Sequence, residues 1–281
     1  MIRLGFHLSI AGSVANAPRE AALEGYGAFQ VFTTSSRSWK NSAMDADGCS
    51  EFKELTRSNG LEAFAHIPYL CNPASPNAEV YRKSKEMLVS NMGNCDALGI
   101  KYLVIHLGSH LGKGIGIGME NICGAVSNAI DSAGNVDILL ENGSGYTNCV
   151  GSRFEDIGKI MDVLDSDRIG LCFDTCHAFA AGYDISDSDG VDKTVEELER
   201  CIGLSRLKLV HLNDAKYPIG SGLDRHEHIG RGNIGREGFV ALFCNGAFRN
   251  GSFVMELPAD SNGGHADDMH AVGSIMADAG I

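Results

Sequence analysis

The sequence predicts an α/β protein folded as a single (β/α)8 TIM barrel, and two observations support this prediction. Short apolar segments alternate strictly with longer helix-like segments along the chain, eight of each. The apolar segments are rich in Val, Ile, Leu and Phe with few polar interruptions, which is typical of parallel strands covered on both faces. A doubly wound open sheet is the alternative, but the Gly-rich phosphate-binding turn expected after its first strand is missing.

The predicted strands begin close to the N-terminus and recur until near the C-terminus. Each is short and ends at or next to a polar residue, so a polar cluster is expected where these ends meet. The strands are expected at Ile2–Leu8, Ala28–Thr33, Leu61–Ile67, Lys101–Leu107, Asp137–Asn142, Ile169–Thr175, Leu207–Asn213 and Ser252–Leu257.

The predicted helices alternate with these strands, and several carry terminal signals. Ser13 is a candidate N-cap, and Gly60 and Gly99 stand where a glycine commonly ends a helix. We expect helices at Ser13–Gly25, Glu51–Asn59, Asn77–Leu98, Met119–Ala133, Arg153–Leu164, Asp192–Ile202, Arg236–Phe243 and Ala266–Ala279. Two long loops, Thr34–Ser50 and Asp214–Gly235, remain, and loops of such length in a compact domain tend to be functional or disordered.

The composition is that of one globular domain over residues 1–281, a common size for α/β barrels. Hydrophobic residues make up 44% and charged residues 21%, which are ordinary globular values. The nine cysteines include no C-x-x-C pair, which favours a reducing compartment. The sequence shows no signal peptide and no run of membrane-spanning length, so we expect a cytoplasmic protein that does not bind membranes.

The charge balance bears on the class of partner. The formal net charge is −13, which argues against a general nucleic-acid binder because phosphate contacts require clustered Lys and Arg. Bound divalent metals and a local basic patch can reverse the sign at one face. Composition therefore disfavours nucleic-acid binding without excluding it.

Polar residues converge at the strand ends, where the active site of such a barrel lies. Singly, a histidine there is usually a hydrogen-bonded core residue, and an acid is usually a helix cap or an ion-pair partner. Together they are difficult to explain structurally, because several carboxylates buried without cations repel one another strongly. The strand-end residues are His7, Thr33, His66, His106, Glu141, Asp174, His211 and Glu256, and the loops add His177, Asp224 and His226.

This convergence predicts a metal centre. Imidazole and carboxylate ligands favour zinc, with manganese or iron as alternatives. One zinc ion requires three or four protein ligands, so the number of candidates suits two or three ions. Such a cluster predicts phosphate-ester hydrolysis, in which the ions activate water and stabilise the attacking and leaving oxygens. The candidate ligands are His66, His106, Glu141, Asp174, His177, His211, Asp224, His226 and Glu256.

Several motifs resemble those of endonuclease IV, the apurinic/apyrimidinic (AP) endonuclease family. The similarity runs from the first strand to the last, and its most specific part is the twelve-residue block FDTCHAFAAGYD, from Phe173 to Asp184. The other motifs are His66-Ile67-Pro68-Tyr69-Leu70, Leu140-Glu141-Asn142, His211-Leu212-Asn213-Asp214, Asp224-Arg225-His226, Gly230-Arg231-Gly232-Asn233-Ile234-Gly235 and Glu256-Leu257-Pro258.

The resemblance implies three zinc ions at the mouth of the barrel, with manganese as an alternative at one position. One ion would be held by His66, His106 and Glu141. A second would share Glu141 as a bridge and add Asp174, His211 and Glu256. The third would be held by His177, Asp224 and His226.

The resemblance also implies the reaction. The protein would cleave double-stranded DNA 5′ to an abasic site, leave a 3′-hydroxyl, remove 3′-blocking groups and act in base excision repair. Glu141 would be catalytic by orienting the attacking hydroxide. Arg37 and Tyr69 match positions at which the family inserts side chains into the duplex. No protein partner is implied, and a monomer is expected.

The chain departs from the family pattern at two places. The segment from Thr33 to Trp39 lacks the Lys and Asn that commonly precede the equivalent of Arg37, which weakens the expected cationic DNA contact. Leu107 stands where the family usually has Pro. Neither change touches a candidate ligand.

Two other classes of function compete with the nuclease. A metal-dependent sugar isomerase or epimerase of related fold would also use the acids and histidine of the last four strands. It has no need for the remaining candidates, which are His66, His106, His177, Asp224 and His226. A metal-binding protein without catalysis would not require open coordination in a mouth ringed by long loops.

Overall fold

The strands form a closed, all-parallel barrel, which confirms the predicted fold class. The computed structural model describes residues 1–35, 38–39, 44–132, 134–258 and 265–281. Strand β1 pairs with both β2 and β10, and this closes the sheet in the order β1-β10-β7-β6-β5-β4-β3-β2. The strands are β1 (Ile2–His7), β2 (Ala28–Phe32), β3 (Glu62–His66), β4 (Tyr102–His106), β5 (Asp137–Glu141), β6 (Ile169–Asp174), β7 (Leu207–His211) and β10 (Gly251–Met255).

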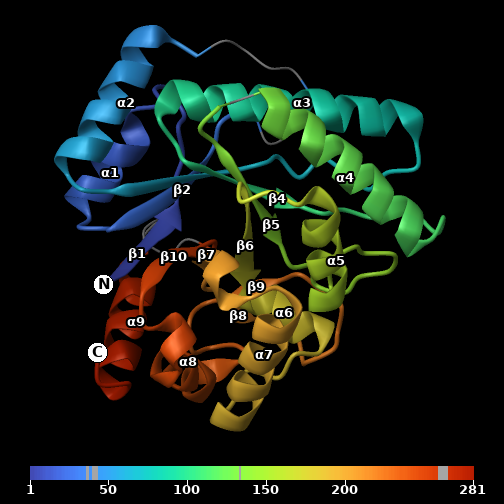
Figure 1. Ribbon diagram of the computed structural model, residues 1–281. Helices are drawn as coiled ribbons and strands as arrows, with labels where there is room; N and C mark the ends of the chain where they lie inside the picture. Colours follow the sequence, from blue (N-terminus) through green and yellow to red (C-terminus); the bar gives the residue numbers. More distant parts are fainter. Residues whose placement is uncertain (36–37, 40–43, 133, 259–264) are drawn as a thin grey trace.

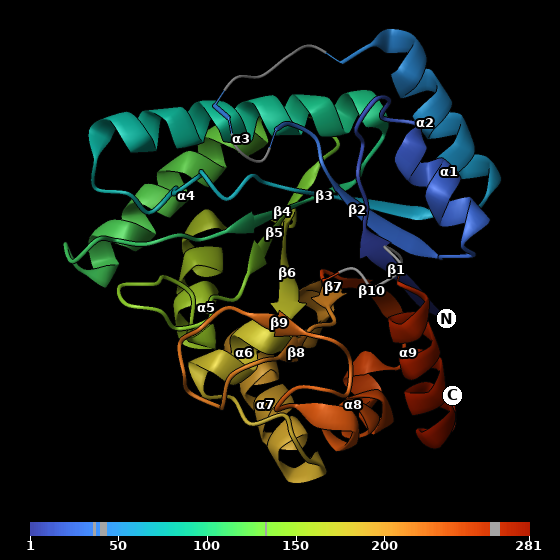
Figure 2. The ribbon, with the colours of Figure 1, turned by 180° about the vertical axis from the view of Figure 1, so that it is seen from behind.

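The long helices surround the barrel on its outside (Figures 1 and 2). Among them α2 is followed by Gly60 and α3 by Gly99, both at positive φ, as the sequence predicted. The helices are α1 (Asn16–Leu23), α2 (Ala46–Ser58), α3 (Ala78–Leu98), α4 (Ile115–Ser132), α5 (Phe154–Leu164), α7 (Ser188–Cys201), α8 (Gly235–Cys244) and α9 (Ala266–Asp278), with short 3-10 turns η1 (Leu204–Arg206) and η2 (Gly246–Phe248).

Several helix starts differ from the predicted ones. The expected cap Ser13 lies outside α1, which begins at Asn16 after Ala15 without a side-chain cap. The start of α2 is earlier than expected because Asp45 caps it by accepting a hydrogen bond from the Gly48 amide. The start of α4 is also earlier, at Ile115. A first helical turn that is largely exposed lacks the apolar repeat of 3.6 residues, so the sequence pattern does not locate its start.

Two elements at the mouth of the barrel were not expected. Helix α6 (Thr175–Ala181) begins directly at the end of β6. In the long loop after β7, β8 (Asp214–Ala215) and β9 (His226–Glu227) form an antiparallel pair. This pair lies beside α6 in both views (Figures 1 and 2), and β8 contacts α6. Both elements therefore form part of the rim around the strand ends.

The core has two layers. Large apolar side chains fill the space between the strands and the helices, and a smaller cluster fills the barrel interior. The interior is a packed core and not a channel, so polar chemistry is confined to the end of the barrel. The interior cluster consists of Ala28, Phe64, Val104, Leu139, Cys172, Leu209 and Val254.

No helix in the described part of the chain combines the length and apolarity that crossing a membrane requires.

Candidate metal centre

The candidate ligands meet because most of them end consecutive strands. His66, His106, Glu141, Asp174 and His211 are the last residues of β3, β4, β5, β6 and β7, in that order. Parallel strands in a barrel end on the same face, so these side chains converge at one mouth. Glu256 joins them directly after β10. The fold therefore brings the polar strand-end residues together, as the sequence predicts.

Glu141 lies at the centre of the cluster. Its Oε2 atom is 3.0 Å from His66 Nε2 and 3.0 Å from His106 Nε2. Its Oε1 atom is 3.1 Å from His211 Nδ1 and 3.3 Å from His177 Nδ1. The two oxygens of one carboxylate therefore face different pairs of imidazoles, which is the geometry of a carboxylate that bridges two cations.

A second group surrounds His211. The Nδ1 atom of His211 lies 3.7 Å from Asp174 Oδ2 and 3.4 Å from Glu256 Oε2. With Glu141, these residues each offer a ligand atom, and the atoms all lie within 4.8 Å of one another. Four ligands at this spacing suit one divalent ion.

A third group lies on the loops. Asp224 Oδ2 is 3.2 Å from His177 Nε2, and Asp224 Oδ1 is 3.2 Å from His226 Nε2. His177 and His226 also form a group with Asp174, within 4.8 Å. Asp174 therefore lies between the second and third groups, although the resemblance assigned it to the second alone.

Backbone carbonyls orient three of the histidines. His66 Nδ1 donates to the Ile67 carbonyl at 2.7 Å, His177 Nδ1 to Asn142 at 2.9 Å, and His226 Nδ1 to Glu256 at 2.8 Å. Such bonds fix the tautomer of an imidazole and leave its Nε2 lone pair available to a metal. Each of these Nε2 atoms faces a carboxylate of the cluster.

The carboxylates and imidazoles of the cluster lie close enough to shift one another's pKa. Burial opposes the charged forms, yet Asp174 and Asp224 raise the pKa of His177, and Cys172, Glu256 and Glu141 raise the pKa of His211, well above the ordinary value. Burial also raises the pKa of Glu141 and Asp224, but the neighbouring imidazoles outweigh it and hold both pKa values below the usual range. Without a cation, protons on the imidazoles balance the carboxylates. A divalent metal can replace those protons, so the donor set fits a metal centre.

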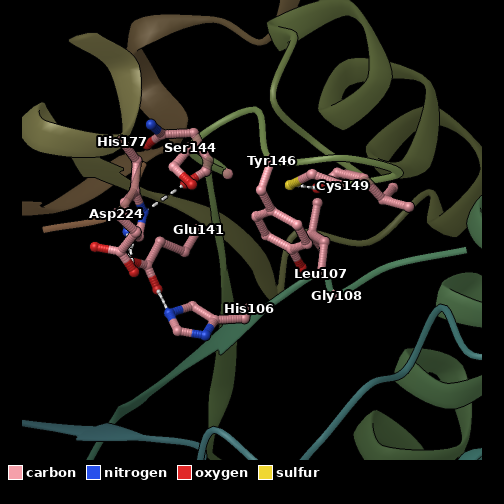
Figure 3. A pocket seen from close by; sticks show the side chains of 12 residues that line it. His106, Leu107, Gly108, Glu141, Ser144, Tyr146, Cys149, His177 and Asp224 are labelled. Atoms are coloured by element: carbon pink, nitrogen blue, oxygen red, sulfur yellow. Dashed lines mark hydrogen bonds and ion pairs between the residues drawn. The ribbon is translucent and has the colours of Figure 1, made fainter. Parts of the chain in front are cut away.

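A small cavity of about 50 Å³ opens beside the cluster. In Figure 3, His106, Glu141 and His177 lie together with Asp224 on one side, while Tyr146 lies across from them. A space of this size is large enough for a water molecule next to the candidate ligands.

The predicted DNA contacts can be placed only in part. Tyr69 is 59% exposed, and its ring centroid lies 5.3 Å from that of His106. It therefore stands at the rim, directly beside the candidate ligands. Arg37 lies outside the described residues.

One residue at the cluster escaped the sequence analysis. The sequence predicts Thr33 as the polar residue at the end of β2, but its hydroxyl donates to Asn91 of α3 at 2.6 Å, away from the mouth. Strand β2 instead contributes Gln30, which is fully buried and bonds to His211 and Glu256. A lone amide in the apolar segment Ala28–Phe32 was the available signal.

Comparisons with known proteins agree with this geometry. The family model described as xylose isomerase-like TIM barrel matches residues 18–274. A protein named "Probable endonuclease 4" from Methanoculleus marisnigri is 44% identical over 264 residues, covering 92% of this chain and 94% of its own. The crystal structure of endonuclease IV from Thermus thermophilus is 33% identical, with a TM-score of 0.87 and coverage of 98% and 99% of the two chains.

Solved structures of the epimerase type are less similar to this chain in sequence. A D-tagatose 3-epimerase-like protein covers 99% of this chain and 98% of its own with a TM-score of 0.76, but it is only 20% identical, which shows the common fold alone. The match to endonuclease IV extends to the sequence over almost the whole length. The chain is therefore a DNA-cleaving hydrolase of the endonuclease IV family.

Proposed function

We propose that this DNA-repair endonuclease uses zinc to hydrolyse the phosphodiester 5′ to an abasic site in double-stranded DNA, leaving a 3′-hydroxyl. The observation that carries the proposal is the position of Glu141, whose two oxygens face separate imidazole pairs at 3.0–3.3 Å. A single-metal enzyme has no use for a second set of ligands on the far side of one carboxylate. A cluster of ions on both sides of Glu141 explains the arrangement.

The proposed ligand sets follow the three groups of side chains. The first ion would be bound by His66, His106 and Glu141, and the second by Glu141, Asp174, His211 and Glu256. The third would be bound by His177, Asp224 and His226, with Asp174 close enough to contribute. Zinc suits these nitrogen and oxygen donors, and manganese is an alternative at one position.

When bound, the ions would activate water and neutralise charge on the attacking and leaving oxygens. We assign Glu141 the role of orienting that water, because its carboxylate lines the cavity beside the candidate ligands. Asp224 and His177 line the same cavity, so they enclose the space in which the water and the phosphate group would meet. The removal of 3′-blocking groups would use the same centre, because such a group is also held through a phosphate ester.

The DNA contacts would lie on the rim. Tyr69 is exposed next to His66 and His106, where an aromatic ring can enter the duplex at the lesion. Arg37 is proposed as the second inserted side chain. Extruding a nucleotide costs least where its base pair is already lost, which contributes to selectivity for abasic sites. We propose that one chain suffices for this reaction, with no obligate protein partner.

The test is incubation of the zinc-loaded protein with a duplex that carries one abasic site, beside an intact duplex and a ketose. The expected result is a single nick 5′ to the site whose 3′ end a polymerase extends. Sugar turnover without nicking would contradict the proposal and favour the isomerase. Nicking of both duplexes alike would contradict the specificity for abasic sites.

A further inference from the structure

Gln30 occupies an unusual position for an amide. It lies in β2, directly opposite His7 of β1 in the strand register, and its side chain is fully buried. Strand β2 provides none of the nine candidate ligands, so nothing in the ligand sets requires a polar residue here. A buried amide is costly unless its donors and acceptor are paired.

The amide is paired with two candidate ligands. Gln30 Nε2 donates to Glu256 Oε1 at 2.7 Å, and Gln30 Oε1 lies 2.9 Å from His211 Nε2. Gln30 Nε2 is also 3.0 Å from His7 Nδ1. Because an ionised carboxylate only accepts hydrogen bonds, the amide nitrogen must face Glu256. The amide oxygen must then face His211.

This orientation dictates the state of the His211 ring. An amide oxygen accepts hydrogen bonds only, so His211 Nε2 must carry a proton. The atom left for a metal is His211 Nδ1, which lies among the oxygens of Glu141, Asp174 and Glu256 at 3.1–3.7 Å.

The same amide also directs Glu256. Its hydrogen bond engages Oε1 of that carboxylate, while Oε2 faces His211 Nδ1 at 3.4 Å. One side chain thereby turns one ligand atom of His211 and one of Glu256 toward the same point.

The orienting bond of His211 differs from those of its neighbours. His66, His177 and His226 donate to backbone carbonyls, which no substitution removes. The equivalent bond of His211 goes to a side chain. A single substitution at Gln30 therefore removes the hydrogen bond that orients His211 in the second ligand group.

We propose that Gln30 is a positioning residue for the second ligand group: it holds His211 as the Nε2-protonated tautomer, aims Glu256 Oε2 inward, and thereby tightens metal binding there. This inference rests on the proposed metal centre. Residues that orient ligands in this way typically contribute about 10–100-fold to metal affinity. The first and third groups make no described contact with Gln30, so their affinities should stay unchanged.

The experiment is a zinc titration of metal-free protein in competition with a chromophoric chelator. It compares the wild type with Gln30→Met, which keeps the length of the side chain but removes its hydrogen bonds to His211, Glu256 and His7. We expect one of the bound ions to weaken by about 10–100-fold while the others hold. Correlation spectra of ¹⁵N-labelled histidine should show His211 protonated at Nε2 in the zinc-loaded wild type and losing this preference in Gln30→Met.

Two further variants separate the possible outcomes. Gln30→Glu can still accept from His211 but cannot donate to Glu256, so the His211 tautomer should persist while affinity falls. Thr33→Val is the matched control, because it removes a buried hydrogen bond that links the end of β2 to α3 and not to the cluster. It should leave zinc affinity unchanged.

The outcomes distinguish the two proposals. A wild type that takes up no zinc contradicts the proposed metal centre itself. A wild type that binds zinc, with Gln30→Met matching it in affinity and in the His211 spectrum, contradicts only the role of Gln30. Equal losses in Gln30→Met and Thr33→Val would show a general disturbance of β2 and would also overturn that role.

Discussion

Two sets of candidate ligands meet at the mouth of the barrel, and they differ in how they are held. The strand set, His66, His106, Glu141, Asp174, His211 and Glu256, comes from strand ends, and its side chains are 0–26% exposed. The loop set, His177, Asp224 and His226, lies beyond the strand ends, and Asp224 is 39% exposed. The fold itself fixes the first set, whereas the second depends on helix α6 and on the β8–β9 pair.

This difference teaches which residues distinguish the nuclease from its barrel relatives. Within the strand set, a sugar isomerase of related fold would also use Glu141, Asp174, His211 and Glu256. His66 and His106 lie at the other oxygen of Glu141, and the loop set offers a further group beside Asp174, so these five residues are the ones that a single-ion site would not need. Loops tolerate change better than strands do, so a new activity is most readily built there.

Removing the metals should have the largest effect, because it disables both sets together. Dialysis against a strong chelator should abolish nicking of the abasic duplex, and added zinc should restore it. Elemental analysis of the active protein should give about three zinc ions per chain, as nine ligands with one shared carboxylate require. A single equivalent in fully active protein would contradict the cluster.

The substitution Glu141→Gln should rank next, since this residue is shared by the first and second ligand groups. We expect cleavage to fall by about 10²–10⁴-fold or more, because an orienting carboxylate and a shared ligand are lost together. Single-turnover kinetics measure the loss, and circular dichroism checks that the fold is retained. Full activity in this variant would remove Glu141 from the mechanism.

Changing His177 to Ala should separate the sets. The loop ion should be lost while the strand ions stay, and cleavage should drop by more than the roughly 10–100-fold typical of residues that merely orient a ligand. Zinc content and cleavage rate are measured on the same sample. The comparison variant is His211→Ala, which should disturb the strand ions instead; equal metal loss in both variants would argue against two separable sets.

The smallest effect is expected at Tyr69, which touches neither set as a ligand. Tyr69→Ala should raise the KM for an abasic duplex by about tenfold, the scale of one lost stacking contact. Zinc content should remain at the wild-type value. Tyr69→Phe keeps the ring and should retain most of the affinity. Loss of zinc from Tyr69→Ala would instead indicate a role in supporting His66 and His106.

Much of the strand set was predictable. The apolar segments locate the strands to within a residue, and the fold class requires their ends to meet. The polar residues at or next to those ends, such as Glu141 and Asp174, could therefore be identified as candidates. Helix α6 was missed because Asp174 ends β6 and also caps the helix by accepting from the His177 amide, so no loop marks the change. Thr33 was expected at the mouth, but Gln30 faces the cluster instead, because alternate side chains of a strand point to opposite faces and the register decides which ones point inward.

By itself the sequence determined the barrel, the family and the residues able to bind metal. These follow from hydrophobic periodicity and from residue type, which are local properties of the chain. Only the tertiary structure decided that Glu141 faces four imidazoles, that Asp174 stands between two ligand groups, and that Gln30 orients His211 across the barrel mouth. Such contacts join residues far apart in the chain, and their distances depend on how the packed strands are staggered.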